Sequence, residues 1–180
     1  MGAVIVVRDP RNVITSLMNH YSLDEETALE MIKSIYRNLK DKNEIDNYAS
    51  YSFISSWANN YNSWKNANLK NKLIIKYEDL EINVKKTFEK IVTFSNKLMN
   101  NKKEIDKEKL NKSARNTNFD ILRKMEKKKG FDEAILSLDG TKKAFFNLGK
   151  QNNYKKLLSL KTTQDIEKVF NKEMKELGYL

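Results

Sequence analysis

Two short apolar runs are the clearest strand signals in the sequence. Residues 3–7 (Ala-Val-Ile-Val-Val) form one continuous run, and residues 72–76 carry Leu-Ile-Ile at their centre. An unbroken run such as the first is typical of a strand that is covered on both faces, as in a parallel sheet. The sequence therefore predicts two strands, the first of them buried on both faces.

The segment after each predicted strand has the apolar spacing of a helix. Asp9 can cap a helix whose first residue is Pro10, and apolar side chains between Thr87 and Leu98 recur at the helical period. Alternation of strand and helix favours an α/β fold.

Further helices are predicted from the same spacing. Ser22 to Glu25 fits a capping box that opens a second helix. The side chains that this helix is expected to bury are Leu29, Ile32, Ile35, Tyr36 and Leu39. Residues 48–64 are expected to form a third helix with an aromatic face that belongs to the core rather than to a ligand pocket. This face consists of Phe53, Trp57, Tyr61 and Trp64.

The second half of the sequence alternates between polar and apolar segments. Residues 100–119 are polar, and we expect them to be irregular. A short helix is expected after Phe119, ending at Gly130, and residues 145–149 form a small apolar cluster in a loop. One helix is expected over residues 162–177 at the C-terminus. Its apolar face would consist of Ile166, Val169, Phe170, Met174 and Leu177.

The composition is that of one globular domain of 180 residues, with 39% apolar and 32% charged residues. No apolar run is long enough to cross a membrane, so we expect a cytoplasmic protein without a membrane partner. The absence of cysteine excludes disulfides and thiolate metal sites, and the single histidine, His20, excludes histidine-rich sites. We therefore expect no metal cofactor.

The net charge of +10 raises the question of a polyanionic partner. Residues 97–130 contain 12 basic and 5 acidic side chains and so contribute +7 of this charge. Only five of the 34 basic residues are arginine, and abundant lysine and asparagine are typical of AT-rich coding sequences. We therefore expect no nucleic-acid partner, although a nucleic-acid-binding module formed by residues 97–129 is an alternative function.

Arg8 lies at the junction of the first strand and the first helix. Open α/β sheets bind ligands outside the carboxyl ends of their strands, and a guanidinium beside the N–H groups of a helix start can bind an anion. Ser16, about two turns into the same helix, can add a hydroxyl donor. These residues predict a phosphate site.

Four segments, in order, resemble sulfotransferases that use 3′-phosphoadenylyl sulfate as donor. Val7 to Ser16 (VRDPRNVITS) resembles their 3′-phosphate-binding segment, and Ile75 to Leu80 (IKYEDL) resembles their strand-ending Tyr-Glu-Asp motif. Thr117 to Arg123 (TNFDILR) is similar to their Thr-x-Phe stretch. Residues 145–155 are similar to their closing loop, with Gly149 in place and Tyr154 where the family has tryptophan.

The resemblance implies a role for each matching residue. Arg8 and Ser16 would bind the 3′-phosphate, and Gly149 and Lys150 would close over it. The adenine pocket would consist of Tyr77, Thr117 and Phe119. Asn147 and Leu148 replace the family's basic pair in the closing loop, which predicts weaker phosphate binding or a substitute role for Lys150.

Two parts of the family pattern have no counterpart in this sequence. None of the five glycines lies in a phosphosulfate loop. His20 lies about three turns beyond Arg8 and is expected to be structural rather than the catalytic base, so the catalytic residues are unknown. Two strands are also fewer than the roughly four to six of a typical sheet. We expect a single P-loop-like sulfotransferase domain over residues 1–180, helix-rich, with a partial parallel sheet flanked by helices and without the N-terminal phosphosulfate-loop portion.

The implied function is transfer of a sulfuryl group from the nucleotide donor to an acceptor hydroxyl or amine that the sequence does not identify. This chain would supply the 3′-phosphate and adenine contacts. Glu78 and Asp79 are expected to have structural roles rather than to form an acid–base pair. Alternatives are a truncated, non-catalytic remnant, or a chain whose sheet is completed by a missing N-terminal segment or another subunit.

Overall fold

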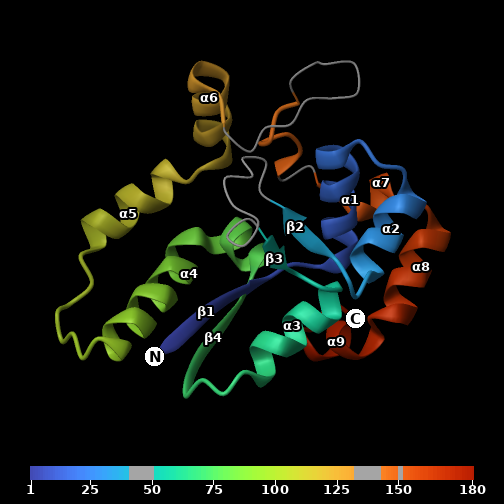
Figure 1. Cartoon of the computed structure of the whole chain (residues 1–180). Helices are drawn as coiled ribbons and strands as arrows, with labels where there is room; N and C mark the ends of the chain where they lie inside the picture. Colours follow the sequence, from blue (N-terminus) through green and yellow to red (C-terminus); the bar gives the residue numbers. More distant parts are fainter. Residues whose placement is uncertain (41–50, 132–142, 150–151) are drawn as a thin grey trace. The chain divides into compact units, whose positions relative to one another are not determined.

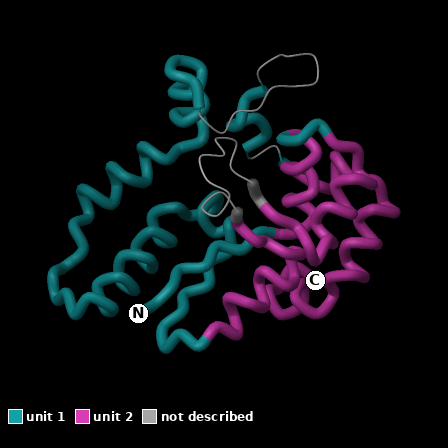
Figure 2. Tube along the Cα trace, viewed as in Figure 1, with its two compact units in different colours: residues 1–8, 20–22, 68–152 teal, residues 9–19, 23–67, 153–180 magenta. Residues whose placement is uncertain are grey.

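The computed structural model describes residues 1–40, 51–131, 143–149 and 152–180 (Figure 1). The chain divides into two compact units, which are described separately (Figure 2). Unit 1 comprises residues 1–8, 20–22 and 68–152, and unit 2 comprises residues 9–19, 23–67 and 153–180.

Unit 1 is built on a parallel pair of strands, β1 (Gly2–Val7) and β4 (Asn71–Lys76). Gly2 lies opposite Asn71 and Val7 opposite Lys76, so both strands end at the same level. This pair confirms both predicted strands. The expectation that the first strand is buried on both faces is wrong, because Val4 and Val6 are exposed whereas Ile5 and Val7 are buried. Among the described residues β1 has one strand neighbour, which leaves part of its surface uncovered.

Helix α4 (Tyr77–Leu98) follows β4 directly and packs against both strands. Asn83 interrupts its helical backbone, with φ −146° and ψ 73°, and its side-chain oxygen accepts a hydrogen bond from the Lys86 backbone N–H at 3.2 Å. Asn83 thus caps the longer second part of α4. The buried Thr87 hydroxyl donates to the carbonyls of Asp79 and Asn83, which ties the two parts together.

Two further helices of unit 1 are α5 (Lys107–Asn116) and α6 (Phe119–Lys129). The expectation of an irregular segment over residues 100–119 is wrong for α5, which packs against α4 and begins where Asp106 accepts a hydrogen bond from the Lys109 N–H. Helix α6 confirms the predicted short helix. It ends at Gly130, whose φ of 79° is one that favours glycine.

Unit 2 consists of helices and a small antiparallel hairpin, β2 (Asn38–Lys40) and β3 (Tyr51–Phe53). Helix α1 (Pro10–Tyr21) confirms the predicted first helix, although its last two residues belong to unit 1. Trp57 and Phe170 meet at 5.3 Å between ring centroids, and the side chains of Ile14, Ile32, Ile166 and Met174 are fully buried. The other helices are α2 (Glu25–Lys33), α3 (Trp57–Asn66), α7 (Tyr154–Leu157), α8 (Leu160–Val169) and α9 (Asn171–Glu176).

The predicted end of the second helix and the predicted start of the third helix are wrong, because the strands β2 and β3 lie between α2 and α3. Asp24, not Ser22, caps α2, and this helix ends at Lys33, so that Ile35 and Tyr36 are exposed and Leu39 belongs to β2. Helix α3 begins at Trp57 rather than at residue 48, because Ser56 accepts a hydrogen bond from the Asn59 N–H and so caps the helix.

The residues before α3 also differ from the prediction. Phe53 lies in β3 and is 62% exposed, and residues 48–50 lie outside the described residues. Within α3, Tyr61 is buried and its ring stacks on that of Trp57, as expected for a core position, whereas Trp64 is exposed.

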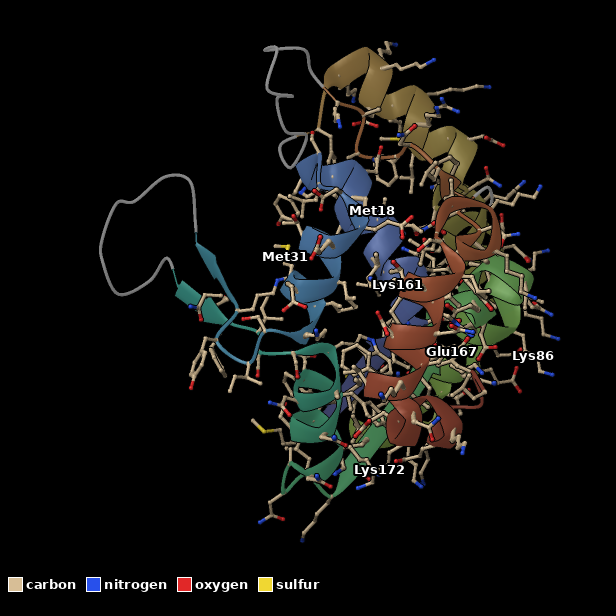
Figure 3. All side chains as sticks on the ribbon, turned by 90° about the vertical axis from the view of Figure 1, so that its right-hand side faces the viewer. Met18, Met31, Lys86, Lys161, Glu167 and Lys172 are labelled. Atoms are coloured by element: carbon tan, nitrogen blue, oxygen red, sulfur yellow. The ribbon has the colours of Figure 1, made fainter. Side chains whose placement is uncertain are left out.

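The predicted single C-terminal helix is two helices. Phe170 has φ −106° and ψ 22°, which ends α8 before α9 begins. Buried Ile166, Phe170 and Met174 nevertheless keep the predicted apolar face, and Lys161 and Lys172 are exposed (Figure 3). Val169, which was expected on that face, is 48% exposed because the helix breaks directly after it.

Tyr61 gives unit 2 a measurable pH dependence. Burial, a 2.9 Å hydrogen bond from its hydroxyl to Glu176, and the negative charges of Glu176 and Glu173 together raise its pKa to about 12. An unfolded tyrosine titrates near pH 10. The unfolded state therefore loses its proton first, and the stability that this hydroxyl contributes is present below about pH 10 and is lost as the pH rises towards about 12.

We expect Tyr61→Phe to flatten this alkaline loss of stability. The measurement is urea unfolding at a series of alkaline pH values, followed by tryptophan fluorescence, because both tryptophans of the chain lie on α3. Tyr36→Phe, at an exposed position, is the matched control. An identical pH dependence in wild type and Tyr61→Phe would contradict the assignment.

Candidate functional site

The candidate site starts from the register of the parallel strands. Because Val7 lies opposite Lys76, the next residues, Arg8 and Tyr77, leave the sheet side by side at its carboxyl end. The Arg8 guanidinium carbon lies 4.3 Å from the centroid of the Tyr77 ring. This distance is that of a cation–π contact. Two of the residues predicted from separate motifs are therefore neighbours.

Phe119 and Gly149 form a second contact between predicted site residues. Gly149 has φ +50°, and a Cβ atom at this position would lie 2.6 Å from Cε1 of Phe119. No side chain fits without displacing the ring, so both the backbone conformation and the close approach require glycine. Gly149 therefore packs directly against Phe119.

The apolar loop cluster at residues 145–149 is held to α6 by a carboxylate. Glu126 accepts hydrogen bonds from the backbone N–H groups of Phe145 at 2.6 Å and of Phe146 at 3.0 Å. The Phe146 ring meets the Phe119 ring edge-on at 6.2 Å. Sequence analysis missed Glu126, because an acidic residue among lysines on a helix surface gives no signal that it anchors a distant loop.

His20 also belongs to this part of unit 1. Its ring makes edge contacts with the rings of Tyr21 at 4.5 Å and Phe145 at 5.8 Å. These contacts agree with the expectation of a structural histidine. Nearby, the Lys143 ammonium donates to the Ser22 hydroxyl at 2.8 Å, which provides a second tie between residues 20–22 and the loop.

The other predicted site residues are placed as follows. Thr117 is exposed at the end of α5, and its hydroxyl donates to the Ser113 carbonyl at 3.1 Å. Ser16 belongs to unit 2, on α1, where its hydroxyl donates to the Asn12 carbonyl at 3.1 Å. Lys150 lies outside the described residues.

The first turn of α1 is not an open anion site. The Asp9 carboxylate already accepts a hydrogen bond from the Arg11 backbone N–H at 2.9 Å, which confirms Asp9 as the cap. A carboxylate at this position places negative charge where the sequence predicted an incoming phosphate. The expectation that α1 offers unpaired N–H groups beside Arg8 is therefore wrong at Arg11.

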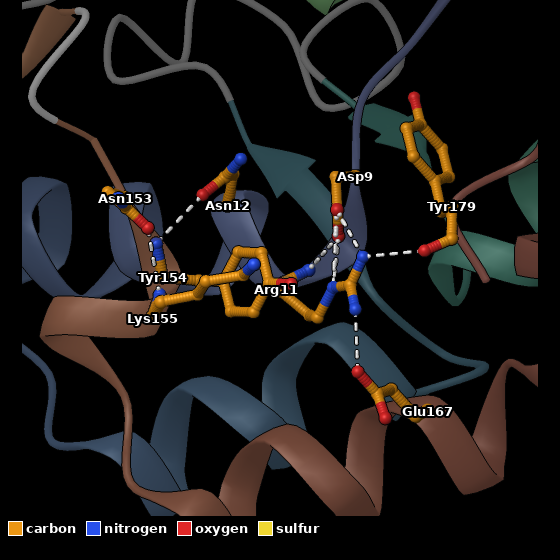
Figure 4. A network of polar contacts seen from close by, with 8 residues as sticks. All are labelled: Asp9, Arg11, Asn12, Asn153, Tyr154, Lys155, Glu167 and Tyr179. Atoms are coloured by element: carbon orange, nitrogen blue, oxygen red, sulfur yellow. Dashed lines mark hydrogen bonds and ion pairs between the residues drawn. The ribbon is translucent and has the colours of Figure 1, made fainter.

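Asp9 is part of a buried ionic network in unit 2 (Figure 4). The Arg11 guanidinium pairs with Asp9 at 2.7 Å and with Glu167 at 2.6 Å, and it donates to the Tyr179 carbonyl at 2.9 Å. The Tyr154 ring lies 4.3 Å from the same guanidinium carbon. Tyr154, aligned with the family's closing-loop tryptophan, thus contacts Arg11.

Arg11 is accordingly a structural cation. Burial lowers its pKa, but hydrogen bonds to Asp9 and Glu167 and the charge of Asp9 outweigh burial and raise the pKa above its usual value. The guanidinium remains charged, and each of its three nitrogens donates at least one hydrogen bond. Sequence analysis gave Arg11 no role of its own. The available signal was the Asp-x-Arg spacing, which lets a capping carboxylate pair with the arginine two residues later.

The part of the chain that the structure describes lacks a metal-binding group and a membrane-spanning helix. Within it, no three histidine or acidic side chains gather in a group that could hold a metal ion. No helix there combines the length and the apolar character needed to cross a membrane.

The family model described as "Sulfotransferase domain" matches residues 3–178. The chain belongs to this family, as the four motifs indicated, and the family's domain carries out sulfuryl transfer. A comparison with curated proteins found no significant match.

Proposed function

We propose that the chain binds 3′-phosphoadenylyl sulfate and takes part in transfer of its sulfuryl group to an acceptor hydroxyl or amine in the cytoplasm. The S–O bond to the donor's phosphate would break as a new bond forms from sulfur to the acceptor's hydroxyl oxygen or amine nitrogen. The acceptor would lose a proton, and adenosine 3′,5′-bisphosphate would be released. Such transfers depend mainly on positioning and charge stabilisation.

The observation that carries this proposal is the pairing of Arg8 with Tyr77. A guanidinium at the carboxyl end of parallel strands can present two N–H donors to a phosphate. We assign the 3′-phosphate to Arg8, with Ser16 as a hydroxyl partner. We assign the adenine pocket to Tyr77, Thr117 and Phe119, and the closing contact to Gly149 and Lys150. The Phe119–Gly149 packing supports this assignment, because it joins two of the proposed binding segments within unit 1.

The test is a binding measurement on the chain itself. By calorimetry, the wild-type chain should bind adenosine 3′,5′-bisphosphate about ten- to a hundredfold more tightly than adenosine 5′-monophosphate, because charge-assisted hydrogen bonds contribute about 1.5–3 kcal/mol. Absolute affinity should be weak, since Asn147 and Leu148 replace a basic pair. Absence of heat at millimolar bisphosphate, or equal binding of the two nucleotides, would refute the proposal.

The basic helices α5 and α6 support a second candidate, binding of a polynucleotide. Nine of their basic side chains are exposed. They are Lys107, Lys109, Lys112, Arg115, Arg123, Lys124, Lys127, Lys128 and Lys129. Binding to any polynucleotide that falls steeply with salt and does not depend on Arg8 would favour this function instead.

A further inference from the structure

We infer that Tyr77 positions the Arg8 guanidinium for the nucleotide's 3′-phosphate, and does not serve as a stacking surface for adenine. This inference rests on the proposed function and assigns a different role to one of its residues. The family resemblance places Tyr77 in the adenine pocket. The structure places its ring 4.3 Å from the cationic carbon of Arg8.

The strand register explains why this contact is built into the fold. Tyr77 is the first residue of α4 and follows β4, whereas Arg8 follows β1. In a parallel pair of strands, the residues that follow two opposite positions reach the same edge of the sheet. The contact between Arg8 and Tyr77 therefore does not require a loop to close. The ring and the cation are therefore already together before a ligand arrives.

A cation held by the face of a ring retains its hydrogen-bonding capacity. The N–H donors of a guanidinium lie in its plane and point outward, so stacking on tyrosine and a two-pronged contact with phosphate are compatible. Free arginine side chains lose considerable rotamer freedom on binding, and a contact that restricts the side chain beforehand reduces this cost. Tyr77 would thereby strengthen phosphate binding without touching the phosphate.

The base has another aromatic partner in the same unit. Phe119 lies at the start of α6 against Gly149, and it belongs to the other segment that the family resemblance assigns to adenine. Tyr77 is thus not required for stacking, and the face of its ring toward Arg8 is occupied by the cation. The two aromatic residues have separate tasks, one acting on the arginine and one on the base.

The discriminating experiment measures how tightly Tyr77 variants bind two nucleotides. Tyr77→Leu should weaken adenosine 3′,5′-bisphosphate binding about three- to thirtyfold, since it removes a cation–π contact, and should change adenosine 5′-monophosphate binding less than twofold. Tyr77→Phe keeps the ring and should retain bisphosphate affinity within about twofold. Equal losses for both nucleotides in Tyr77→Leu, or a loss in Tyr77→Phe as large as in Tyr77→Leu, would overturn the inference.

A double-mutant cycle gives a readout that does not need the second nucleotide. In the Arg8→Ala background, Tyr77→Leu should have no further effect on bisphosphate binding, because Tyr77 acts through Arg8. Additive losses would overturn the inference. If Tyr77→Leu does not fold, as judged by circular dichroism, Tyr77→Met takes its place in the cycle. A wild-type chain without preference for the 3′-phosphate refutes the proposed function, whereas a wild-type preference with additive losses refutes this inference alone.

Discussion

Arg8→Ala is expected to weaken binding of adenosine 3′,5′-bisphosphate about a hundredfold. The variant removes both prongs of the proposed phosphate contact, and two charge-assisted hydrogen bonds of about 1.5 kcal/mol each correspond to about that factor. Binding of adenosine 5′-monophosphate should change little, because this nucleotide has no 3′-phosphate. Calorimetric titration of both nucleotides measures the two effects.

Two control variants separate a specific site from diffuse attraction. Arg8→Lys keeps the charge but loses the planar fork, so we expect a partial loss, intermediate between wild type and Arg8→Ala. Arg123→Ala removes an exposed arginine of α6 in the same unit and should leave binding unchanged. If Arg123→Ala weakened bisphosphate binding as much as Arg8→Ala, the bisphosphate would be attracted by a basic surface rather than bound at the end of the strands.

The Arg8–Tyr77 pair could be predicted in part from the sequence, because both residues follow apolar strands in recognisable motifs. The contact between them could not, since it depends on the register that sets Val7 opposite Lys76. The packing of Gly149 on Phe119 could not be predicted from the sequence either. It joins residues thirty positions apart through a loop anchored by Glu126, and no local pattern encodes such closure.

The wrong predictions of secondary structure have identifiable physical causes. Phe53, Trp57 and Tyr61 have helical spacing, but β3 ends at Phe53, and Ser55 adopts a positive φ of 62° just before the cap at Ser56. Side-chain spacing alone cannot reveal such a turn. Helix α5 was missed because it carries few apolar residues, and its local signal was the cap at Asp106.

Removal of the Asp9 carboxylate is expected to have the largest effect on stability. Asp9 and Arg11 are each 7% exposed in their side chains and pair at 2.7 Å. Breaking a buried pair leaves an uncompensated charge, which typically costs about 3–5 kcal/mol. Glu167 still pairs with the guanidinium at 2.6 Å, so we expect Asp9→Ala to destabilise unit 2 by about 3 kcal/mol.

Urea unfolding followed by tryptophan fluorescence measures this loss, since Trp57 and Trp64 both lie in unit 2. Asp9→Asn preserves a good helix cap and removes only the charge, so the difference between the two variants gives the contribution of the cap. Glu30→Ala is the matched control, because it breaks the exposed Glu30–Lys33 pair and should cost less than about 1 kcal/mol. A cost below about 0.5 kcal/mol for Asp9→Ala would contradict the ionic role.

The same variant links stability to the candidate site. Asp9 follows Arg8 directly, and its carboxylate fixes the backbone at Arg11 as well as the Arg11 side chain. We therefore expect Asp9→Ala to weaken bisphosphate binding even under conditions in which unit 2 remains folded, because the Arg8 backbone loses its anchor on one side. Asp9→Asn, which can still accept the Arg11 N–H hydrogen bond, should retain more of this binding than Asp9→Ala. Equal binding by the two variants would show that the cap does not hold Arg8 in place.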